Sequence, residues 1–206
     1  MFHVHFSDHV LNDFNTLFKS LPPNRDYHVS GVPSTFHGRL FPRDYLHIVH
    51  CSLVLHWLSR ASTVKNSGKI FYTGAPQEVI EAYLRQHAYD MSKFLDAQAQ
   101  EVVSGGLVML VMPACPDGVP HSKFLVSVFF DMLGDCLVDL ARKGIIEENK
   151  VDEFNLPMFF TSPQEFEQTM KQNQGFSMER MEVLPEVNGK ELFPRHVPHR
   201  ASNQRS

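Results

Sequence analysis

PQEVIEAYLRQHAYDMSKFLDAQAQEVVSGGLVMLVM (residues 76–112) contains a helix pattern followed directly by a strand pattern. Apolar side chains recur at helical spacing over Pro76–Val103, and proline is favoured in the first turn of a helix. The Gly105-Gly106 pair is expected to end this helix. Residues 107–112 are continuously apolar, which is typical of a strand covered on both faces of a parallel sheet.

Strand and helix patterns alternate along the rest of the chain. Further strands are predicted at residues 2–7, 27–32, 46–50 and 178–184. Further helices are predicted at residues 12–18 with Asn12 as cap, at residues 121–142, and from Ser162, where Ser-Pro-Gln-Glu forms a capping box. The helix over residues 121–142 is expected to be buried on more than one side. This alternation predicts an α/β fold with a largely parallel sheet, here one domain over residues 1–186 and a disordered tail over residues 187–206.

Composition and charge narrow the function classes. The 206 residues are 43% hydrophobic and 20% charged, which is ordinary for a globular protein. The net charge of -4 argues against a nucleic-acid binder. No apolar run reaches the ~18–20 residues of a membrane span, and the first residues lack a signal-peptide pattern. The separated Cys51, Cys115 and Cys136 fit a reducing compartment, so we expect a cytoplasmic protein without nucleic-acid or membrane partners.

A few residues could carry chemistry, each with an ordinary structural alternative. Asp8 follows a strand, where a carboxylate either accepts from ribose hydroxyls or caps a helix. Trp57, beside His56, is either core packing or the wall of a pocket for a small acid. Asp152 and Asn155 are either oxygen ligands for Mg²⁺ or Ca²⁺ or part of a solvated loop. No glycine-rich nucleotide motif is present, which weighs against a cofactor site of that kind.

Several long segments, in order, resemble the plant SABATH family of S-adenosylmethionine (SAM)-dependent carboxyl methyltransferases. They are FSDHVLNDFNTLFKSLP (6–22), GVPSTFHGRLFP (31–42), HCSLVLHWLSR (50–60), SGKIFYTGAPQEVIEAYLRQHAYDMSKFLDAQAQEVVSGGLVMLVMP (67–113) and KGIIEENKVDEFNLPMFFTSPQEFE (143–167). The resemblance covers about residues 2–185. It implies a Rossmann-like methyltransferase fold without its first strands and with part of a helical cap.

The resemblance also implies three groups of site residues, and no catalytic acid or base. The positions matching the SAM-binding residues are Asp8, His9, Thr35 and Phe36. His9 stands where the family has Leu, and Thr35 where it has Ser. The positions matching the substrate pocket are Leu53, His56 and Trp57, with Leu53 in place of a common Tyr. The positions matching a Mg²⁺ site are Asn66, Asp152, Phe154 (through its carbonyl) and Asn155.

The implied function is methyl transfer from SAM to the carboxylate of a small apolar acid, by a cytoplasmic homodimer. The family begins well before Met1, and its first strand and glycine-bearing acidic motif have no counterpart here. We therefore expect weak SAM binding and impaired transfer by this chain. The alternative is a non-catalytic truncated paralogue that serves as a dimer partner or has no function.

Overall fold

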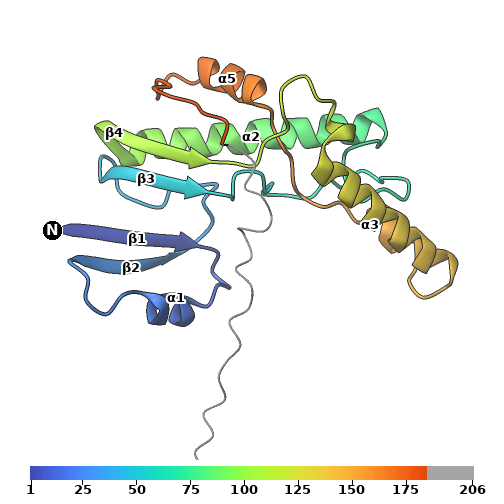
Figure 1. Ribbon diagram of the computed structural model, residues 1–206, viewed down its shortest axis with the longest axis horizontal. Helices are drawn as coiled ribbons and strands as arrows, with labels where there is room; N and C mark the ends of the chain where they lie inside the picture. The colour runs from blue at the N-terminus through green and yellow to red at the C-terminus, as the bar shows by residue number, and fades with distance from the viewer. Residues whose placement is uncertain (185–206) are drawn as a thin grey trace, which may run out of the picture.

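The computed structural model describes residues 1–184, in which four strands and six helical segments are present (Figure 1). The strands are β1 (Phe2–Asp8), β2 (Tyr27–Pro33), β3 (Leu46–Ser52) and β4 (Val102–Val111). The helices are α1 (Phe14–Ser20), α2 (Gln77–Glu101), the 3-10 turn η1 (His121–Lys123), α3 (Leu125–Arg142), α4 (Glu148–Glu153) and α5 (Pro163–Gln172). The predicted tail at 187–206 lies outside the described residues.

The strands form two parallel pairs, which confirms the α/β class. β1 pairs with β2 in a register running from Phe2↔Tyr27 to Asp8↔Pro33, and β3 pairs with β4. Figure 1 shows the pairs side by side, with all four arrows pointing the same way. The carboxyl ends of the strands therefore meet at one edge, where open α/β folds bind ligands.

Helix α1 covers one face of the first pair. A Cβ on Gly31 of β2 would lie 2.8 Å from Phe14 Cδ1, so glycine permits the close approach of the helix. The N-cap of α1 is Asp13, whose side chain accepts from the backbone N–H groups of Asn15 and Thr16. The prediction of Asn12 as cap is wrong by one residue, because the Asp13 carboxylate satisfies two of the free N–H groups at once.

The junction between α2 and β4 differs from the prediction. The helix ends at Glu101 and the strand begins at Val102, so Gly105 and Gly106 lie inside β4. A Cβ on Gly106 would lie 2.9 Å from the backbone oxygen of His47. Gly106 therefore permits close approach of the backbones at an irregularity in the β3–β4 register, Gly105 adopts a positive φ of 79°, and neither ends a helix.

Two apolar clusters form the core. One joins Cys51 of β3 and Leu55 of the following loop to Met91, Phe94 and Leu95 of α2. The second contains Phe71, Tyr72, Tyr83, Phe159 and Phe160, with Phe130 of α3 packed against it. The first cluster lies beneath the carboxyl edge of β3 and so supports the loop that follows this strand.

The second half of the chain differs from the prediction in some elements and agrees with it in others. Helix α3 is not buried on more than one side, because Leu125, Phe129 and Met132 are 78%, 60% and 64% exposed. The strand expected at residues 178–184 is absent, and α4 was not predicted. The predicted capping box at Ser162 is confirmed at the start of α5.

Within residues 1–184, no helix is both long and apolar enough to cross a membrane.

Candidate functional site

The segments expected to bind the cofactor and the substrate follow three parallel strands. Asp8 ends β1, Thr35 and Phe36 follow β2, and Leu53 directly follows β3. The backbone N–H of Ser34 donates to the carbonyl of Asp8 (2.9 Å), which joins the ends of β1 and β2. The fold thus brings these residues to the same edge of the parallel strands.

The carboxylate of Asp8 is exposed and held in position from its own turn. Its Oδ1 accepts from the N–H of His9 (2.7 Å), and its Oδ2 accepts from Asn12 Nδ2 (2.9 Å). Because Asp13 caps α1, Asp8 does not serve as the helix cap. A carboxylate offers about four lone-pair sites, so Asp8 retains acceptor capacity for a hydroxyl-bearing ligand.

The loop after β2 is fixed at both ends. Phe36 packs against the cluster formed by Cys51, Leu55 and the middle of α2. Beyond it, the buried Glu101 accepts hydrogen bonds from the N–H groups of Leu40 and Phe41 through Oε1 (2.9 Å for Phe41). The His9 ring accepts only from the N–H of Leu11 (3.2 Å) and is exposed, so it shapes the turn after Asp8.

The loop after β3 begins with an unusual backbone conformation. Leu53 has a φ of 56°, which L-residues other than Asn and Asp seldom adopt, and its side chain is exposed. Its N–H donates to the carbonyl of Val111 (2.8 Å) at the end of β4. This bond holds Leu53 in the strained conformation and turns the chain sharply toward His56 and Trp57.

His56 and Trp57 form an aromatic wall, a surface of two rings that is partly exposed to solvent. The His56 ring stacks on Phe160 with centroids 5.4 Å apart, and lies 5.5 Å from the Trp57 ring. Burial lowers the pKa of His56, so its ring is neutral at neutral pH. Its Nδ1 is buried without a hydrogen-bond partner, while Trp57 is partly exposed. The wall can therefore present N–H donors to an anion without adding a fixed charge.

Asn66, Asp152 and Asn155 converge from segments far apart in the sequence. Asn66 Nδ2 donates to Asn155 Oδ1 (2.9 Å), and the Asn66 N–H donates to the carbonyl of Asp152 (3.0 Å). Asp152 Oδ1 accepts from the N–H of Gly68 (2.7 Å). Asn155 Nδ2 donates to the carbonyls of Ser62 and Val64, both at 3.0 Å. These bonds tie the 62–68 loop to the end of α4 and to the residues that follow it.

The same residues were expected to hold a cation, and their environment bears on that expectation. Asn66 is fully buried, and its Oδ1 has no hydrogen-bond partner. Asp152 lines a cavity of about 560 Å³ together with Gly68, Lys69 and Asp135. The Phe154 side chain is exposed, so only its backbone could take part. An amide oxygen and a carboxylate are ligand types that Mg²⁺ accepts, and among the described residues no group of three or more His, Cys, Asp or Glu side chains could hold a metal ion.

Comparison with known proteins identifies the family. A family model described as SAM dependent carboxyl methyltransferase matches residues 1–205. The chain belongs to this family. Loganic acid O-methyltransferase of Catharanthus roseus is 44% identical over 193 residues, which are 89% of this chain and 52% of that protein. Farnesoic acid carboxyl-O-methyltransferase of Arabidopsis thaliana is 37% identical over 195 residues, which are 91% of this chain and 56% of that protein.

A solved methyltransferase of this family shares the fold. The structure of loganic acid methyltransferase with SAH superposes with a TM-score of 0.82 at 44% identity, covering 87% of this chain and 53% of that chain. This likeness confirms the expected partial α/β methyltransferase fold. The chain spans about half the length of the relatives that it matches.

The structure also brings residues to this candidate site that the sequence analysis did not single out. Phe160 supports the His56 ring, and the N–H of Phe159 donates to the carbonyl of His56 (2.8 Å). Trp57 forms an isolated antiparallel bridge with Met158. The segment after Asn155 thus lies against the loop after β3. The pair Phe159-Phe160, shortly after Pro157, is the sequence feature that could have indicated this segment. So short a segment shows no periodic pattern.

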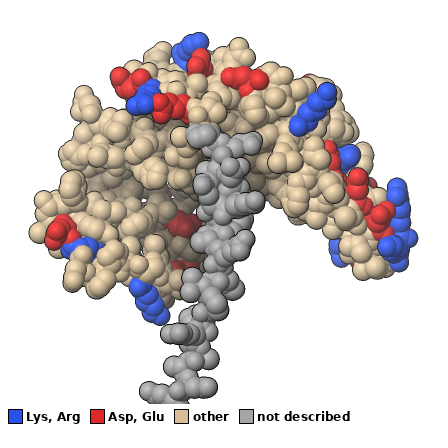
Figure 2. Space-filling model, viewed as in Figure 1, with Lys and Arg blue, Asp and Glu red and all other residues tan. Residues whose placement is uncertain are grey.

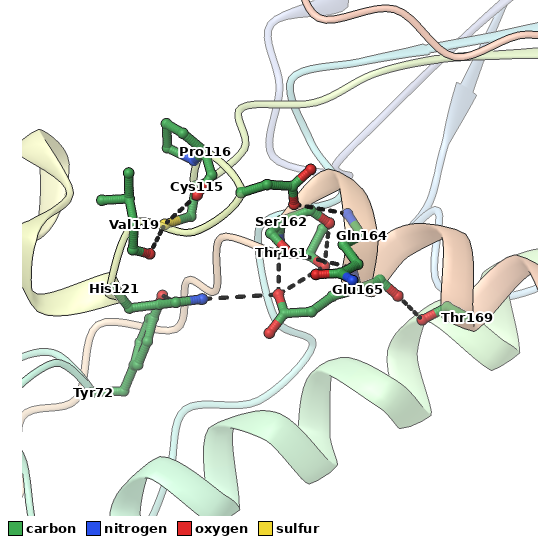
Figure 3. A network of polar contacts seen from close by, with 11 residues as sticks. Tyr72, Cys115, Pro116, Val119, His121, Thr161, Ser162, Gln164, Glu165 and Thr169 are labelled. Carbon is green, nitrogen blue, oxygen red and sulfur yellow. Dashed lines mark hydrogen bonds and ion pairs between the residues drawn. The ribbon is translucent and has the colours of Figure 1, made fainter.

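A polar network fixes the other end of this segment (Figure 3). Tyr72 Oη lies 2.7 Å from His121 Nδ1, and His121 Nε2 lies 3.8 Å from Glu165 Oε2. Glu165 Oε2 also accepts from the N–H of Ser162 (2.7 Å). The network connects η1, α5 and the apolar core, and so holds the segment that carries Phe159 and Phe160.

Proposed function

We propose that this chain contributes a site at which SAM methylates the carboxylate of a small, largely apolar acid. The observation that supports it best is the neutral His56 beside Trp57, in an aromatic wall at the strand edge that also carries Asp8. An apolar wall with a few N–H donors suits an acid whose only strongly polar group is the carboxylate.

Methyl transfer to a carboxylate needs positioning more than proton transfer. The acceptor acid has a pKa of about 4 and is already ionised at neutral pH, so no general base is required. SAM, when bound, supplies the methyl group on a positively charged sulfur. Holding acceptor oxygen, methyl carbon and sulfur in line contributes up to about 7–11 kcal/mol in favourable cases.

The proposed roles of the residues are those that the family resemblance implies, and they fit the chemistry of the side chains. Asp8 accepts from the ribose hydroxyls, and Thr35 and Phe36 border the adenine. His9 completes the turn beside them. His56 and Trp57 donate N–H groups to the acceptor carboxylate, while Leu53 and Phe160 exclude water.

The proposal is tested by transfer of radiolabelled methyl from SAM to a panel of acids. Loganic and farnesoic acids belong in the panel because relatives of this chain are named for them. We expect acid-dependent transfer that falls at least tenfold in Trp57→Ala and in His56→Leu, whereas Tyr89→Ala on the exposed side of α2 leaves it unchanged. Transfer that is the same in all three variants would contradict the assigned pocket.

A second candidate function is that of a non-catalytic partner. It is favoured by the open edges of β1 and β3, which leave the strands beside Asp8 incompletely paired. On this account the chain binds SAM weakly and transfers no methyl group to any acid in the panel. The transfer assay therefore separates the two functions, and a complex with a second polypeptide would support the non-catalytic one.

We further propose that Mg²⁺ binds Asn66, Asp152, Asn155 and the carbonyl of Phe154, with a structural role. The cation would satisfy the unpartnered Asn66 Oδ1 and neutralise Asp152, which joins the two segments more tightly. Millimolar Mg²⁺ should raise the melting temperature of the chain, and Asp152→Asn should abolish this rise. An equal rise in the variant would exclude the site.

A homodimer and a cytoplasmic location complete the proposal. The exposed apolar side chains of Leu125, Phe129 and Met132 on α3 support self-association. The free thiols of Cys51, Cys115 and Cys136 support a reducing compartment.

A further inference from the structure

The turn that follows β1 is fixed by hydrogen bonds among its own residues, 8–12. The N–H of Asn12 donates to the carbonyl of His9 (2.9 Å), which closes the turn. The Asp8 carboxylate accepts from the N–H of His9 (2.7 Å) and from Asn12 Nδ2 (2.9 Å). The N–H of Leu11 donates to Nδ1 of the His9 ring (3.2 Å). The two polar side chains at the end of β1 are therefore oriented by the protein itself.

The bond from Leu11 determines which nitrogen of the His9 ring carries the hydrogen. In a neutral imidazole, one ring nitrogen accepts a hydrogen bond and the other carries an N–H. Because Nδ1 is the acceptor here, the hydrogen of the neutral ring lies on Nε2. The side chain is exposed, and within residues 1–184 its Nε2 has no hydrogen-bond partner. The turn thus presents an N–H donor next to the Asp8 carboxylate.

The exposed surface of this turn combines three kinds of chemical group. The Asp8 carboxylate accepts hydrogen bonds, and His9 Nε2 can donate one. The apolar side chains of Val10 and Leu11 are 62% and 85% exposed. A nucleoside carries the matching groups, because it has ribose hydroxyls, acceptor nitrogens and an apolar aromatic face. Sites for small molecules typically combine apolar contacts with a few placed polar groups, so the turn suits a nucleoside.

The charges near the turn favour a ligand that has no phosphate group at this point. Lys19 and Arg25 are the only Lys and Arg residues among residues 1–33. Figure 2 shows correspondingly few Lys and Arg side chains over β1 and β2, at its lower left. Phosphate groups are usually bound by Lys, Arg or the free N–H groups at a helix N-terminus, and in α1 two of these N–H groups already donate to Asp13. The turn therefore suits a nucleoside more than a nucleoside phosphate.

We propose that His9 Nε2 donates a hydrogen bond to N3 of the purine, and so makes the site selective for bases that carry an acceptor at this position. The inference rests on the proposed SAM site, in which Asp8 accepts from the ribose hydroxyls. His9 directly follows Asp8, so its donor is available to the part of the base that lies nearest the ribose. In adenine this part is N3, on the edge that DNA shows in its minor groove, whereas N7 lies on the major-groove edge.

A donor of fixed position makes this recognition selective. An analogue with C–H in place of N3 leaves the Nε2–H group without an acceptor in the complex. Sites that hydrogen-bond a ligand discriminate strongly against analogues that lack the bonded group. Leucine, which the resembling family has at this position, could contact the base but could not distinguish a nitrogen from a C–H group. His9 is thus a specificity-determining residue in this chain.

The test measures the binding of three nucleosides to the full ¹⁵N-labelled chain at about pH 8.5, where imidazole side chains are neutral. Adenosine, 3-deazaadenosine and 7-deazaadenosine are titrated while the amide signals of residues 8–12 are followed. We expect 3-deazaadenosine to bind at least about tenfold more weakly than adenosine, and 7-deazaadenosine to bind as adenosine does. Equal affinities of all three, or a loss with 7-deazaadenosine alone, would overturn the proposal.

Substitutions at His9 separate the donor from the shape of the turn. In His9→Leu the three nucleosides should bind equally, whereas His9→Gln, which retains an N–H donor, should keep the preference for adenosine. His28→Leu is the control, because His28 is exposed and pairs with His3 at the opposite end of the two strands. A preference that persists in His9→Leu, or that is lost in His28→Leu, would contradict the role of His9.

The tautomer of the His9 ring is measured independently of any ligand. Long-range ¹H–¹⁵N spectra of the imidazole distinguish the nitrogen that carries the hydrogen from the one that does not. We expect the hydrogen on Nε2, as the bond from Leu11 requires. A hydrogen on Nδ1 would contradict the proposal.

Asp8→Ala distinguishes a failure of this inference from a failure of the proposed SAM site. We expect this variant to lose the binding of adenosine. Adenosine that shifts none of the amides of residues 8–12, or binding that Asp8→Ala leaves intact, would overturn both the site and the role of His9. Binding that depends on Asp8 but does not distinguish the three nucleosides would overturn only the role of His9.

Discussion

Asp90, in the middle of α2, holds Ser59 by two hydrogen bonds. The Ser59 N–H donates to Asp90 Oδ2 (2.8 Å), and Ser59 Oγ donates to Asp90 Oδ1 (2.6 Å). Gln86 Nε2 donates a third bond to the same buried carboxylate (2.9 Å). Because Ser59 lies two residues after Trp57, this carboxylate anchors the loop that carries the proposed acid pocket to the longest helix.

Asp90→Asn should loosen that loop. The amide cannot accept both Ser59 bonds and that of Gln86 in the same geometry, so we expect a loss of about 1–3 kcal/mol in the free energy of unfolding. Trp57 is the single tryptophan, so its emission reports directly on the loop and should shift to longer wavelength. Urea unfolding followed by fluorescence measures both effects. Asp96→Asn, an exposed position on the same helix, should change neither, and equal effects of the two variants would refute the anchor.

The buried His87 should make the fold sensitive to acid. Burial lowers its pKa from 6.5 to about 4, partly offset by Asp90 and Glu165. Between these two values the unfolded chain binds a proton on this ring and the folded chain does not. The free energy of unfolding should therefore fall by up to about 3 kcal/mol as the pH decreases through this range. Above this range, neither state binds the proton and the full free energy of unfolding is retained.

The check is the urea midpoint near neutral pH and near about pH 5. In the wild-type chain the midpoint should fall, and in His87→Leu it should fall less. Burial also lowers the pKa of His37 and of His56, so some pH dependence remains in the variant. Identical slopes in the two proteins would show that His87 is not the group responsible.

Asn155 should be needed for stability whether or not a cation binds. Its side chain is buried, accepts from Asn66 and donates to the carbonyls of Ser62 and Val64. Asn155→Ala leaves these groups unpaired, so we expect a loss of about 2–4 kcal/mol in Mg²⁺-free buffer, measured by thermal unfolding. Asn149→Ala, on the exposed surface of α4, is the control. A loss below about 0.5 kcal/mol would mean that the two segments are held together elsewhere.

The apolar face of α3 should control self-association. Phe129→Lys removes an exposed aromatic ring from that face, so stability should change by less than about 0.5 kcal/mol while the tendency to associate falls. Light scattering coupled to size exclusion measures the mass. A dimer that persists unchanged in the variant would place the interface on another surface.

Local chemistry made part of the fold predictable. The capping box at Ser162 and Glu165 depends on two side chains three residues apart, and the structure contains it as expected. The sequence predicts Asn12 as the cap of α1, whereas Asp13 serves as the cap, because both residue types cap helices and only the position of the following turn decides between them. Gly105 and Gly106 predict a helix end but lie inside β4, because a helix end and an irregular strand both favour glycine.

Contacts between elements far apart in the sequence determine the features that local sequence patterns do not predict. The apolar residues of α3 predict burial, but the core contacts only the side that carries Val126 and Phe130. The site residues Asn66 and Asp152 could be placed together only through family resemblance, since nothing in their spacing brings residues so far apart into contact. The support of His56 by Phe160 depends on the path of a segment without regular structure. Periodic sequence patterns do not predict such a path.

We propose that this chain carries the ribose and adenine side of a SAM site at Asp8, Thr35 and Phe36. Saturation-transfer NMR with SAH measures this most directly, because it detects weak binding and resolves the parts of the ligand. We predict transfer to the ribose and adenine protons, little transfer to the protons of the amino-acid half, and loss of the signal in Asp8→Ala but not in the exposed control Asp26→Ala. Equal transfer to all parts of the ligand, or a signal that Asp8→Ala leaves intact, would contradict the account.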